Sequence, residues 1–283
     1  SDKSGIFNIY EVDLSTNEET QLTDSKEESF FVRGYSPNTG EVIYSADKGG
    51  NENSHIYLIR EGNSIDLTPG ENTKASYVGW TNDELGMYII SNSRDPRFFD
   101  LYKIDIVTLK SEMVFKNDSG YNLNSISNND RYLVLSLNLS RSEQKLFLYD
   151  VKSKQQVEIS NQAANFSGQN FDKNDENYFY TTNYDSEFYY LMSYNLKNGE
   201  RSTVYKTNWD VAFSYLSKNN SYRVTAVNED AQNKLTIKNM SDQSDLNLIG
   251  FENMNINSVG FSEDEKLLRV SAGSPNSPGD IYT

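Results

Sequence analysis

Two arginines and two aspartates lie within the ten-residue segment SNSRDPRFFD, residues 91–100. The planar guanidinium group can form two parallel hydrogen bonds to a carboxylate, so this spacing suits recognition of a carboxylate on a peptide or on a partner protein. Arg94, Asp95, Arg97 and Asp100 are therefore our candidates for partner or peptide binding. The competing interpretation is a local salt bridge to Asp95 or Asp100, which contributes little at a surface.

Other residue types that carry chemistry are scarce. The chain has no cysteine and a single histidine, His55, and no Gly-x-Ser-x-Gly sequence occurs. Thiolate chemistry is therefore excluded, and His55 is the one histidine that could act as the base of a Ser-His pair. The run DKNDEN, residues 172–177, alternates oxygen side chains but lacks the glycine and final glutamate of a calcium loop. We expect no catalytic residue, no metal site and no cofactor in this chain.

Charge and hydropathy exclude further classes. With 26 basic and 41 acidic residues the net charge is −15, which repels phosphate backbones and anionic membranes. No apolar run approaches the roughly 18 residues of a membrane span. We therefore expect neither a nucleic-acid partner nor a membrane span. The first residues, SDKSGIFNIY, have no signal-peptide character, and the composition leaves open whether a soluble chain resides in the cytoplasm or the periplasm.

Segments similar to DLYKID, residues 100–105, recur along the whole chain. Each relative opens on an apolar residue, and these residues recur at gaps of 44 to 47: Ile9, Ile56, Leu101, Leu146, Leu191, Leu235 and Ile281. A second set of segments precedes six of them and carries a hydroxyl residue at a matching place: Ser45, Ser91, Ser136, Thr181, Thr225 and Ser271. Two independent markers with one period indicate an internal repeat.

Each period contains four short strand patterns. In the second they are ASYVGW, GMYIIS, FDLYKIDI and KSEMVF, and a polar turn separates the first two. The equivalent turns, such as SPNTG, SNND and SEDEK, have the composition of β-hairpins. No segment sustains a helical period bounded by caps. The 36 aromatic residues also favour strands. Four strands per ~45 residues predict an all-β fold, a β-propeller of four-stranded blades.

The chain ends leave the number of blades open. Five periods are complete, from SFFVRG to LNLIG, and the third and fourth strand patterns of another precede them. A first, second and third strand pattern follow them, ending in DIYT. We favour seven blades in the parent protein with incomplete end blades here, because DIYT would be surplus in a smaller ring. The alternative is a six-bladed ring closed by the two chain ends. We expect residues 1–283 to form a single propeller domain.

Several repeats carry more than propeller features. The segments are DKGGNENSHIYLI (47–59), SNSRDPRFFDLYKID (91–105), YDSEFYYL (184–191), NWDVAFSYLSKNNSYRVTAVNEDAQNKLTI (208–237) and SPNSPGDIYT (274–283). In this order they resemble the N-terminal propeller of bacterial serine peptidases of the prolyl oligopeptidase family, the acylaminoacyl-peptidase and dipeptidyl-peptidase relatives. The similarity covers nearly the whole chain.

The resemblance implies a division of labour. In that family an α/β-hydrolase domain with a Ser-Asp-His triad follows the propeller, which caps the active site and restricts entry to peptides. The motifs of such a domain are absent from this sequence. The resemblance therefore implies a non-catalytic propeller that gates and scaffolds a separate hydrolase domain, with that domain and a peptide substrate as partners. This chain alone is not expected to be an enzyme.

Two other functions remain open from the residues. A free-standing propeller of the kind found in cell-envelope assemblies would mediate protein–protein interaction without a second domain. A pectin-degrading lyase of propeller fold is disfavoured, because that class relies on a His-rich metal site and this chain has one histidine. Under every reading SRDPR is expected to lie in a loop between the second and third strands of a blade, free of the packing that shapes the blade.

Overall fold

The computed structural model describes residues 1–251, 254–274 and 276–283, so Pro275 of the SPNSPGDIYT segment lies outside the described part. The chain divides into two compact units, an N-terminal unit, Ser1–Tyr121, and a C-terminal unit, Asn122–Thr283. Regular structure in the described residues consists of β-strands alone. No helix long and apolar enough to cross a membrane occurs in that part of the chain.

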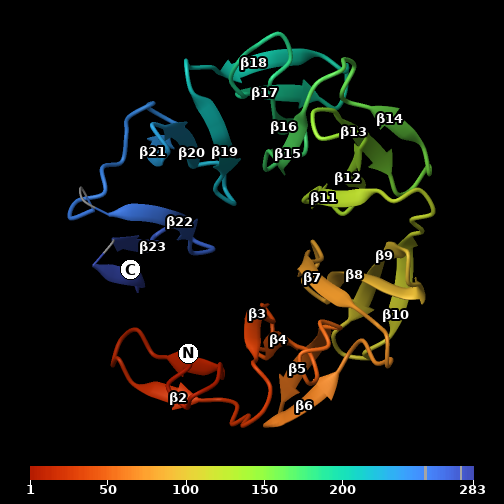
Figure 1. Cartoon of the computed structure of the whole chain (residues 1–283), viewed down its shortest axis with the longest axis vertical. Coiled ribbons are helices and arrows are strands. Elements are labelled where there is room, and N and C mark those ends of the chain that lie inside the picture. The colour runs from red at the N-terminus through yellow and green to blue at the C-terminus, as the bar shows by residue number, and fades with distance from the viewer. Residues whose placement is uncertain (252–253, 275) are drawn as a thin grey trace. The chain divides into compact units, whose positions relative to one another are not determined.

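The N-terminal unit contains one two-stranded and two four-stranded antiparallel sheets (Figure 1). The two-stranded sheet is formed by β1 (Tyr10–Val12) and β2 (Glu19–Gln21). The first complete sheet comprises β3 (Phe31–Tyr35), β4 (Val42–Ala46), β5 (His55–Arg60) and β6 (Asn63–Asp66). The second comprises β7 (Ala75–Trp80), β8 (Gly86–Asp95), β9 (Phe98–Asp105) and β10 (Ser111–Phe115).

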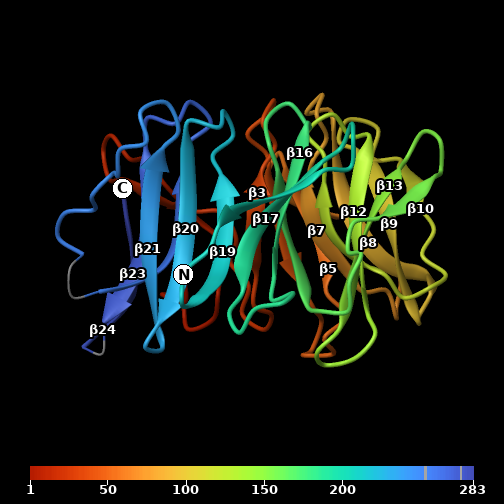
Figure 2. The same cartoon turned by 90° about the horizontal axis from the view of Figure 1, so that it is seen from above.

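The C-terminal unit contains two four-stranded and two three-stranded antiparallel sheets. The four-stranded sheets comprise β11 (Asn122–Ile126), β12 (Tyr132–Asn138), β13 (Gln144–Asp150) and β14 (Gln156–Glu158), then β15 (Phe166–Phe171), β16 (Asn177–Thr182), β17 (Tyr190–Asn195) and β18 (Arg201–Tyr205). The three-stranded sheets comprise β19 (Asp210–Leu216), β20 (Tyr222–Glu229) and β21 (Gln232–Asn239), then β22 (Asn255–Phe261), β23 (Leu268–Ser274) and β24 (Ser277–Tyr282). Figure 2 shows β20 and β21 side by side, as their register requires.

The predicted repeat is confirmed, because each sheet contains successive strands paired in chain order. Two details differ from expectation. The LNLIG segment of the fifth period forms no strand, and only the isolated bridge between Lys238 and Asp245 marks the place. The number of blades is also corrected. In the described residues six sheets have three or four strands, which matches the six-bladed alternative; β1 and β2 alone are left for the seventh blade that we favoured.

The hairpin between the first two strands of each sheet is closed by the same hydrogen bond, although the turn of β3 and β4 places its left-handed residue one position later than the others. An amide at its start donates to the carbonyl five residues later, as from Thr81 to Gly86 and from Ser127 to Tyr132. One turn residue adopts a left-handed conformation in every case, and these residues are Gly40, Glu84, Asp130, Asp175, Asn220 and Glu265. The predicted hairpin chemistry is therefore confirmed, and DKNDEN forms such a turn.

These hairpins also connect successive sheets within a unit. In the C-terminal unit the amide of Asn128 donates to Asp175 Oδ1 at 2.8 Å, and the amide of Asn219 donates to Glu265 Oε1 at 2.6 Å. In the N-terminal unit Asn38 Nδ2 donates to the carbonyl of Glu84 at 3.0 Å. The partners lie one repeat apart, so each hairpin turn is hydrogen-bonded to the equivalent turn of the next sheet.

A second turn repeats between the third and fourth strands. Its first residue is an aspartate or asparagine whose side chain accepts from the amide two residues later: Asp13, Asp105, Asp150, Asn195 and Asn239. Its fifth residue is left-handed, and these residues are Asn17, Leu109, Lys154, Gly199 and Gln243. Only one of the five is a glycine, the residue that adopts this conformation without steric cost.

Replacing Lys154 with glycine is therefore expected to stabilise the protein. Lys154 has φ 60° and an exposed side chain, so the change relieves the left-handed strain, while the greater freedom of the unfolded glycine offsets part of the gain. We expect the free energy of unfolding to rise by about 0.5 kcal/mol in urea denaturation. Gly199→Ala, at the same turn position, is the matched opposite and should lower it; equal effects in both variants would contradict this explanation.

The cores lie between successive sheets. In the N-terminal unit Ile43, Ile56 and Leu58 of one sheet pack against Met87 and Ile89 of the next. In the C-terminal unit an equivalent cluster joins the sheet of β11–β14 to that of β15–β18, and another joins the two three-stranded sheets. The central strands are therefore buried on both faces, which explains their continuous apolar runs.

Candidate functional site

The candidate residues lie on the hairpin of β8 and β9. β8 continues to Asp95, which pairs with Phe98, and only Pro96 and Arg97 form the turn. SRDPR is thus not the free loop that the sequence predicted. The pairing of β8 with β9 is irregular between Ser91 and Asp95, and in this stretch the Arg94 side chain contacts Asp100 of the adjacent strand.

Arg94 makes a two-point ion pair with Asp100. Its Nε donates to Asp100 Oδ2 at 2.6 Å, and one terminal nitrogen donates to Asp100 Oδ1 at 2.8 Å. The Asp100 side chain is 0% exposed, whereas that of Arg94 is 25% exposed. Removing a counter-charge from a buried carboxylate is costly, so we expect this pair to stabilise the hairpin.

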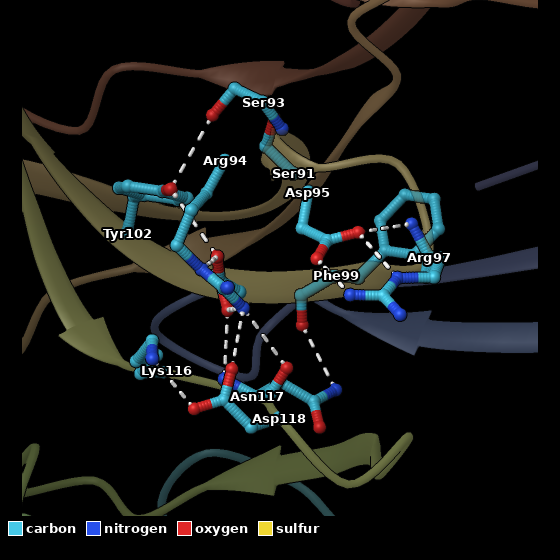
Figure 3. A network of polar contacts seen from close by, with 11 residues as sticks. Ser91, Ser93, Arg94, Asp95, Arg97, Phe99, Tyr102, Lys116, Asn117 and Asp118 are labelled. Carbon is cyan, nitrogen blue, oxygen red and sulfur yellow. Dashed lines mark hydrogen bonds and ion pairs between the residues drawn. The ribbon is translucent and has the colours of Figure 1, made fainter.

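The segment after β10 completes the network (Figure 3). The amide of Asn117 donates to Asp100 Oδ1 at 2.7 Å, and the Asn117 carbonyl accepts from Arg94 at 3.1 Å. Asp118 lies 3.2 Å from the same guanidinium group. The Asn117 side chain is itself buried and donates to the carbonyls of Phe99 and Tyr121. Arg94 and Asp100 therefore connect the β8–β9 hairpin to the chain that leaves β10.

The charges of this pair are mutually stabilised. Burial raises the pKa of the Asp100 carboxyl, but hydrogen bonds from the Arg94 guanidinium and the Asn117 amide outweigh it and hold that pKa below its ordinary value. The hydrogen bond from Arg94 to Asp100 in turn raises the pKa of the guanidinium. Both groups are therefore ionised at neutral pH.

Arg97 is the exposed member of the set. Its side chain is 75% exposed and donates to Asp95 through Nε at 3.0 Å and a terminal nitrogen at 2.7 Å. The hydrogen bond from the Arg97 side chain is the main reason why the pKa of Asp95 lies far below its ordinary value. The Arg97 guanidinium also lies over the Phe98 ring, with 5.2 Å between its central carbon and the ring centroid. Its other edge is open to solvent or a partner.

The structure thus brings all four candidates together, as two separate pairs. The partners from the KND segment, Asn117 and Asp118, were not identified from the sequence. A signal for them exists in the repeat. In three repeats a hydroxyl residue after the fourth strand accepts a hydrogen bond from the amide of the repeated apolar residue near the start of the third strand. These pairs are Thr23 with Ile9, Thr68 with Ile56 and Ser160 with Leu146. Asn117 occupies the same region of its repeat without a hydroxyl group.

His55 lies at the start of β5, as its sequence position suggested. Its Nδ1 is 2.7 Å from Asp66 Oδ2 and its Nε2 is 3.0 Å from the Gly70 carbonyl, so both ring nitrogens face acceptors on neighbouring chain segments. Such a ring is held in place as a structural side chain. Across the described residues, no three His, Asp or Glu side chains gather in a way that could hold a metal ion.

Repeated antiparallel sheets of three or four strands, with cores between neighbours, define a β-propeller. The chain belongs to the family described as the prolyl oligopeptidase N-terminal beta-propeller domain, whose model matches residues 9–283. The resemblance seen in the sequence is therefore confirmed.

A curated relative supports the same family. A 103-residue segment is 33% identical to dipeptidyl aminopeptidase BIII of Pseudoxanthomonas mexicana and covers 35% of this chain and 14% of that protein. The chain thus matches a small part of a much longer relative.

Two solved structures share the fold at low sequence identity. A structure from a study of two prolyl endopeptidases has a TM-score of 0.67 and 13% identity over 97% of this chain and 46% of its own. Oligogalacturonate lyase of Vibrio parahaemolyticus has a TM-score of 0.66 and 14% identity over 98% of this chain and 82% of its own. The chain therefore spans less than half of the prolyl endopeptidase chain.

Proposed function

We propose that this chain is the non-catalytic propeller domain of a prolyl oligopeptidase-like serine peptidase. In this role it gates the access of peptides to a separate α/β-hydrolase domain and serves as the scaffold of that domain. The match of residues 9–283 to the family's N-terminal propeller domain is the observation that carries the proposal. The lack of a free histidine also supports a non-catalytic role, because a serine peptidase needs a histidine as its catalytic base. His55 is the only histidine in the sequence, and it contacts Asp66 and Gly70.

Arg97 is the contact residue that we propose for this function. Of the two guanidinium groups, that of Arg94 is committed to buried Asp100, whereas that of Arg97 is 75% exposed and paired with Asp95 at the tip of the hairpin. A carboxylate from the hydrolase domain or a peptide terminus can approach its open edge with little desolvation of the pair. Asp95 then fixes the direction of the guanidinium, and Arg94 and Asp100 hold the hairpin.

The purified chain alone should not hydrolyse aminoacyl or dipeptidyl chromogenic substrates, because it lacks a serine nucleophile elbow and a free histidine. The same chain expressed together with the sequence that follows it in its gene should hydrolyse them. Turnover by the chain alone that survives His55→Ala, or a following sequence without a serine hydrolase domain, would refute the proposal.

Arg97→Glu in the active, longer protein provides the matched test of the contact. We expect a higher Michaelis constant for peptides or weaker association of the two domains, with the melting temperature unchanged. Lys152→Glu, at an exposed turn of another sheet, is the charge-matched control. Unchanged kinetics together with unchanged association of the two domains in Arg97→Glu would remove this residue from the proposal.

A further inference from the structure

Arg223 occupies a position on β20 that other sheets fill with apolar side chains. Counted from the residue whose carbonyl closes the first hairpin, the equivalent residues are Val42, Met87, Leu133, Tyr178 and Leu268. The first four are buried, and Leu268 packs against an apolar cluster. The position faces the preceding sheet, as Tyr178 does in packing against Val134 and Leu146. Arg223 therefore places a cation where the repeat builds a core.

The guanidinium of Arg223 has few partners there. Its central carbon lies 4.4 Å from the centroid of the Phe179 ring on the preceding sheet, and one terminal nitrogen donates to Ser214 Oγ at 3.3 Å. Among the described residues no carboxylate forms an ion pair with it. Asp245, which lines the same cavity, is paired with Lys238 at 2.8 Å. Most of the five N–H donors of Arg223 therefore have no acceptor in the described part of the chain.

A cavity of about 500 Å³ adjoins this group, between the sheet of β15–β18 and that of β19–β21. Val204, Tyr205 and Met240 supply apolar walls, and Thr225 and Thr236 supply hydroxyl groups beside Arg223. This volume and this mixture of apolar walls with a few polar groups are typical of small-molecule sites.

Electrostatics give the cavity a preference. Burial lowers the pKa of Arg223 to about 10, which still leaves the guanidinium charged at neutral pH. A partly desolvated cation without a counter-charge gains most from an anion, and a planar carboxylate fits the guanidinium fork in two-point contact. The net charge of −15 for the whole chain weakens the attraction for multivalent anions such as phosphate.

We propose that the cavity beside Arg223 binds the carboxylate of a small organic acid or of a peptide C-terminus. The Arg223 guanidinium binds the two carboxylate oxygens, and the hydroxyl groups of Thr225 and Thr236 donate hydrogen bonds to the remaining lone pairs of these oxygens. Val204, Tyr205 and Met240 contact the apolar part of the ligand. The site is independent of the gating role, because it uses residues of the C-terminal unit and not the Arg97 hairpin.

Isothermal titration calorimetry on the purified chain tests the site with four probes: N-acetyl-alanyl-alanine, its C-terminal amide, propionate, and inorganic phosphate. We expect the free dipeptide acid to bind and its amide to bind at least about tenfold more weakly, because the amide cannot neutralise Arg223. Binding of propionate as tight as that of the dipeptide acid would assign the site to small acids. Binding of neither carboxylate, or of phosphate in preference to both, would overturn the proposal.

Arg223→Met provides the decisive variant, since methionine is the natural residue at the equivalent position of β8. Carboxylate binding should be lost, while the melting temperature should stay constant or rise, because an apolar side chain suits that position. Arg223→Lys keeps the charge without the fork and should bind at least about tenfold more weakly than the unchanged protein. Arg131→Met, which removes an arginine paired with Asp150 in the same unit, is the control and should bind normally. Carboxylate binding that persists in Arg223→Met would overturn the proposal.

Discussion

Arg94→Ala is expected to lower the melting temperature on the order of 5 to 10 °C, because it leaves Asp100 buried without its counter-charge. The Asn117 amide remains as a donor to Asp100, but one neutral hydrogen bond does not replace a two-point pair with a cation. The chain that leaves β10 also loses the hydrogen bond from Arg94 to the Asn117 carbonyl. Differential scanning calorimetry measures the effect.

Arg97→Ala is the matched control, because it removes an arginine three residues away whose own side chain is 75% exposed, although its partner Asp95 is 19% exposed. Its melting temperature should stay within about 1 °C of the unchanged protein, as for most exposed substitutions. Equal losses in the two variants would mean that the hairpin as a whole, not the buried carboxylate, sets the cost.

Acid provides an independent readout of the same pair. The folded-state pKa of Asp100 lies below its ordinary value of about 4, so the ionised group contributes stability above that pH and the contribution disappears as pH falls through the folded pKa. In Arg94→Ala burial should instead raise the pKa of Asp100, and protonation should then relieve the variant. We expect the difference in melting temperature to shrink between pH 7 and about pH 3; a constant difference would exclude the charge as its cause.

Gly168→Ala is expected to lower the free energy of unfolding by about 1 to 3 kcal/mol, the usual cost of overpacking a well-filled core. Gly168 lies on β15, and a Cβ atom there would stand 2.2 Å from Tyr178 Oη and 2.9 Å from Asn124 Cβ. Tyr178 has no room to retreat, because it is fully buried and its hydroxyl group is held by Ser125 Oγ at 3.0 Å. Urea denaturation measures the loss.

A second substitution tests whether the close contact with Tyr178, rather than any replacement of a strand glycine by alanine, causes the loss of stability. Tyr178→Phe removes the atom nearest to the new methyl group and alone should cost about 1 kcal/mol for the lost hydrogen bond. The loss in free energy of unfolding in the double variant should therefore be smaller than the sum of the losses in the two single variants. Gly79→Ala on β7 is the control, since a Cβ atom there meets nothing within 4 Å, and it should be close to neutral. Strict additivity would refute the steric explanation.

The repeat made most of the sheet structure predictable. Each period has its own hairpin turns and apolar strand residues, so the strand order follows from local patterns. The failures occur where pairing depends on distant residues. The LNLIG segment has an apolar pattern but forms no strand: the isolated bridge lies just before it at Asp245, and the Leu246 amide donates to the Ile237 carbonyl. Sequence spacing alone also cannot count incomplete sheets. The choice between six and seven blades was therefore open.

The candidate site was predictable only in part. The cluster of four charged residues was evident, and a local salt bridge was one of the two interpretations. Which carboxylate pairs with which arginine depends on the strand continuing to Asp95, beyond an irregularity in the pairing that starts after Ser91. Asn117 lies 17 residues from Asp100, so its contact depends on the register of three strands. The signal for Asn117 becomes visible only when its repeat is compared with those that carry a hydroxyl residue at that place.

The hairpin contacts from Asn128 to Asp175 and from Asn219 to Glu265 have a mechanical consequence. Each contact joins one sheet to the next in the chain, so the load on a stretched chain passes from neighbour to neighbour. A pulling force applied to one end should then release the C-terminal unit one repeat at a time. Each step would free about 45 residues, or roughly 150 Å of extended chain. A fault in one sheet would accordingly lower the force at which its immediate neighbours yield, while more distant sheets would keep their resistance.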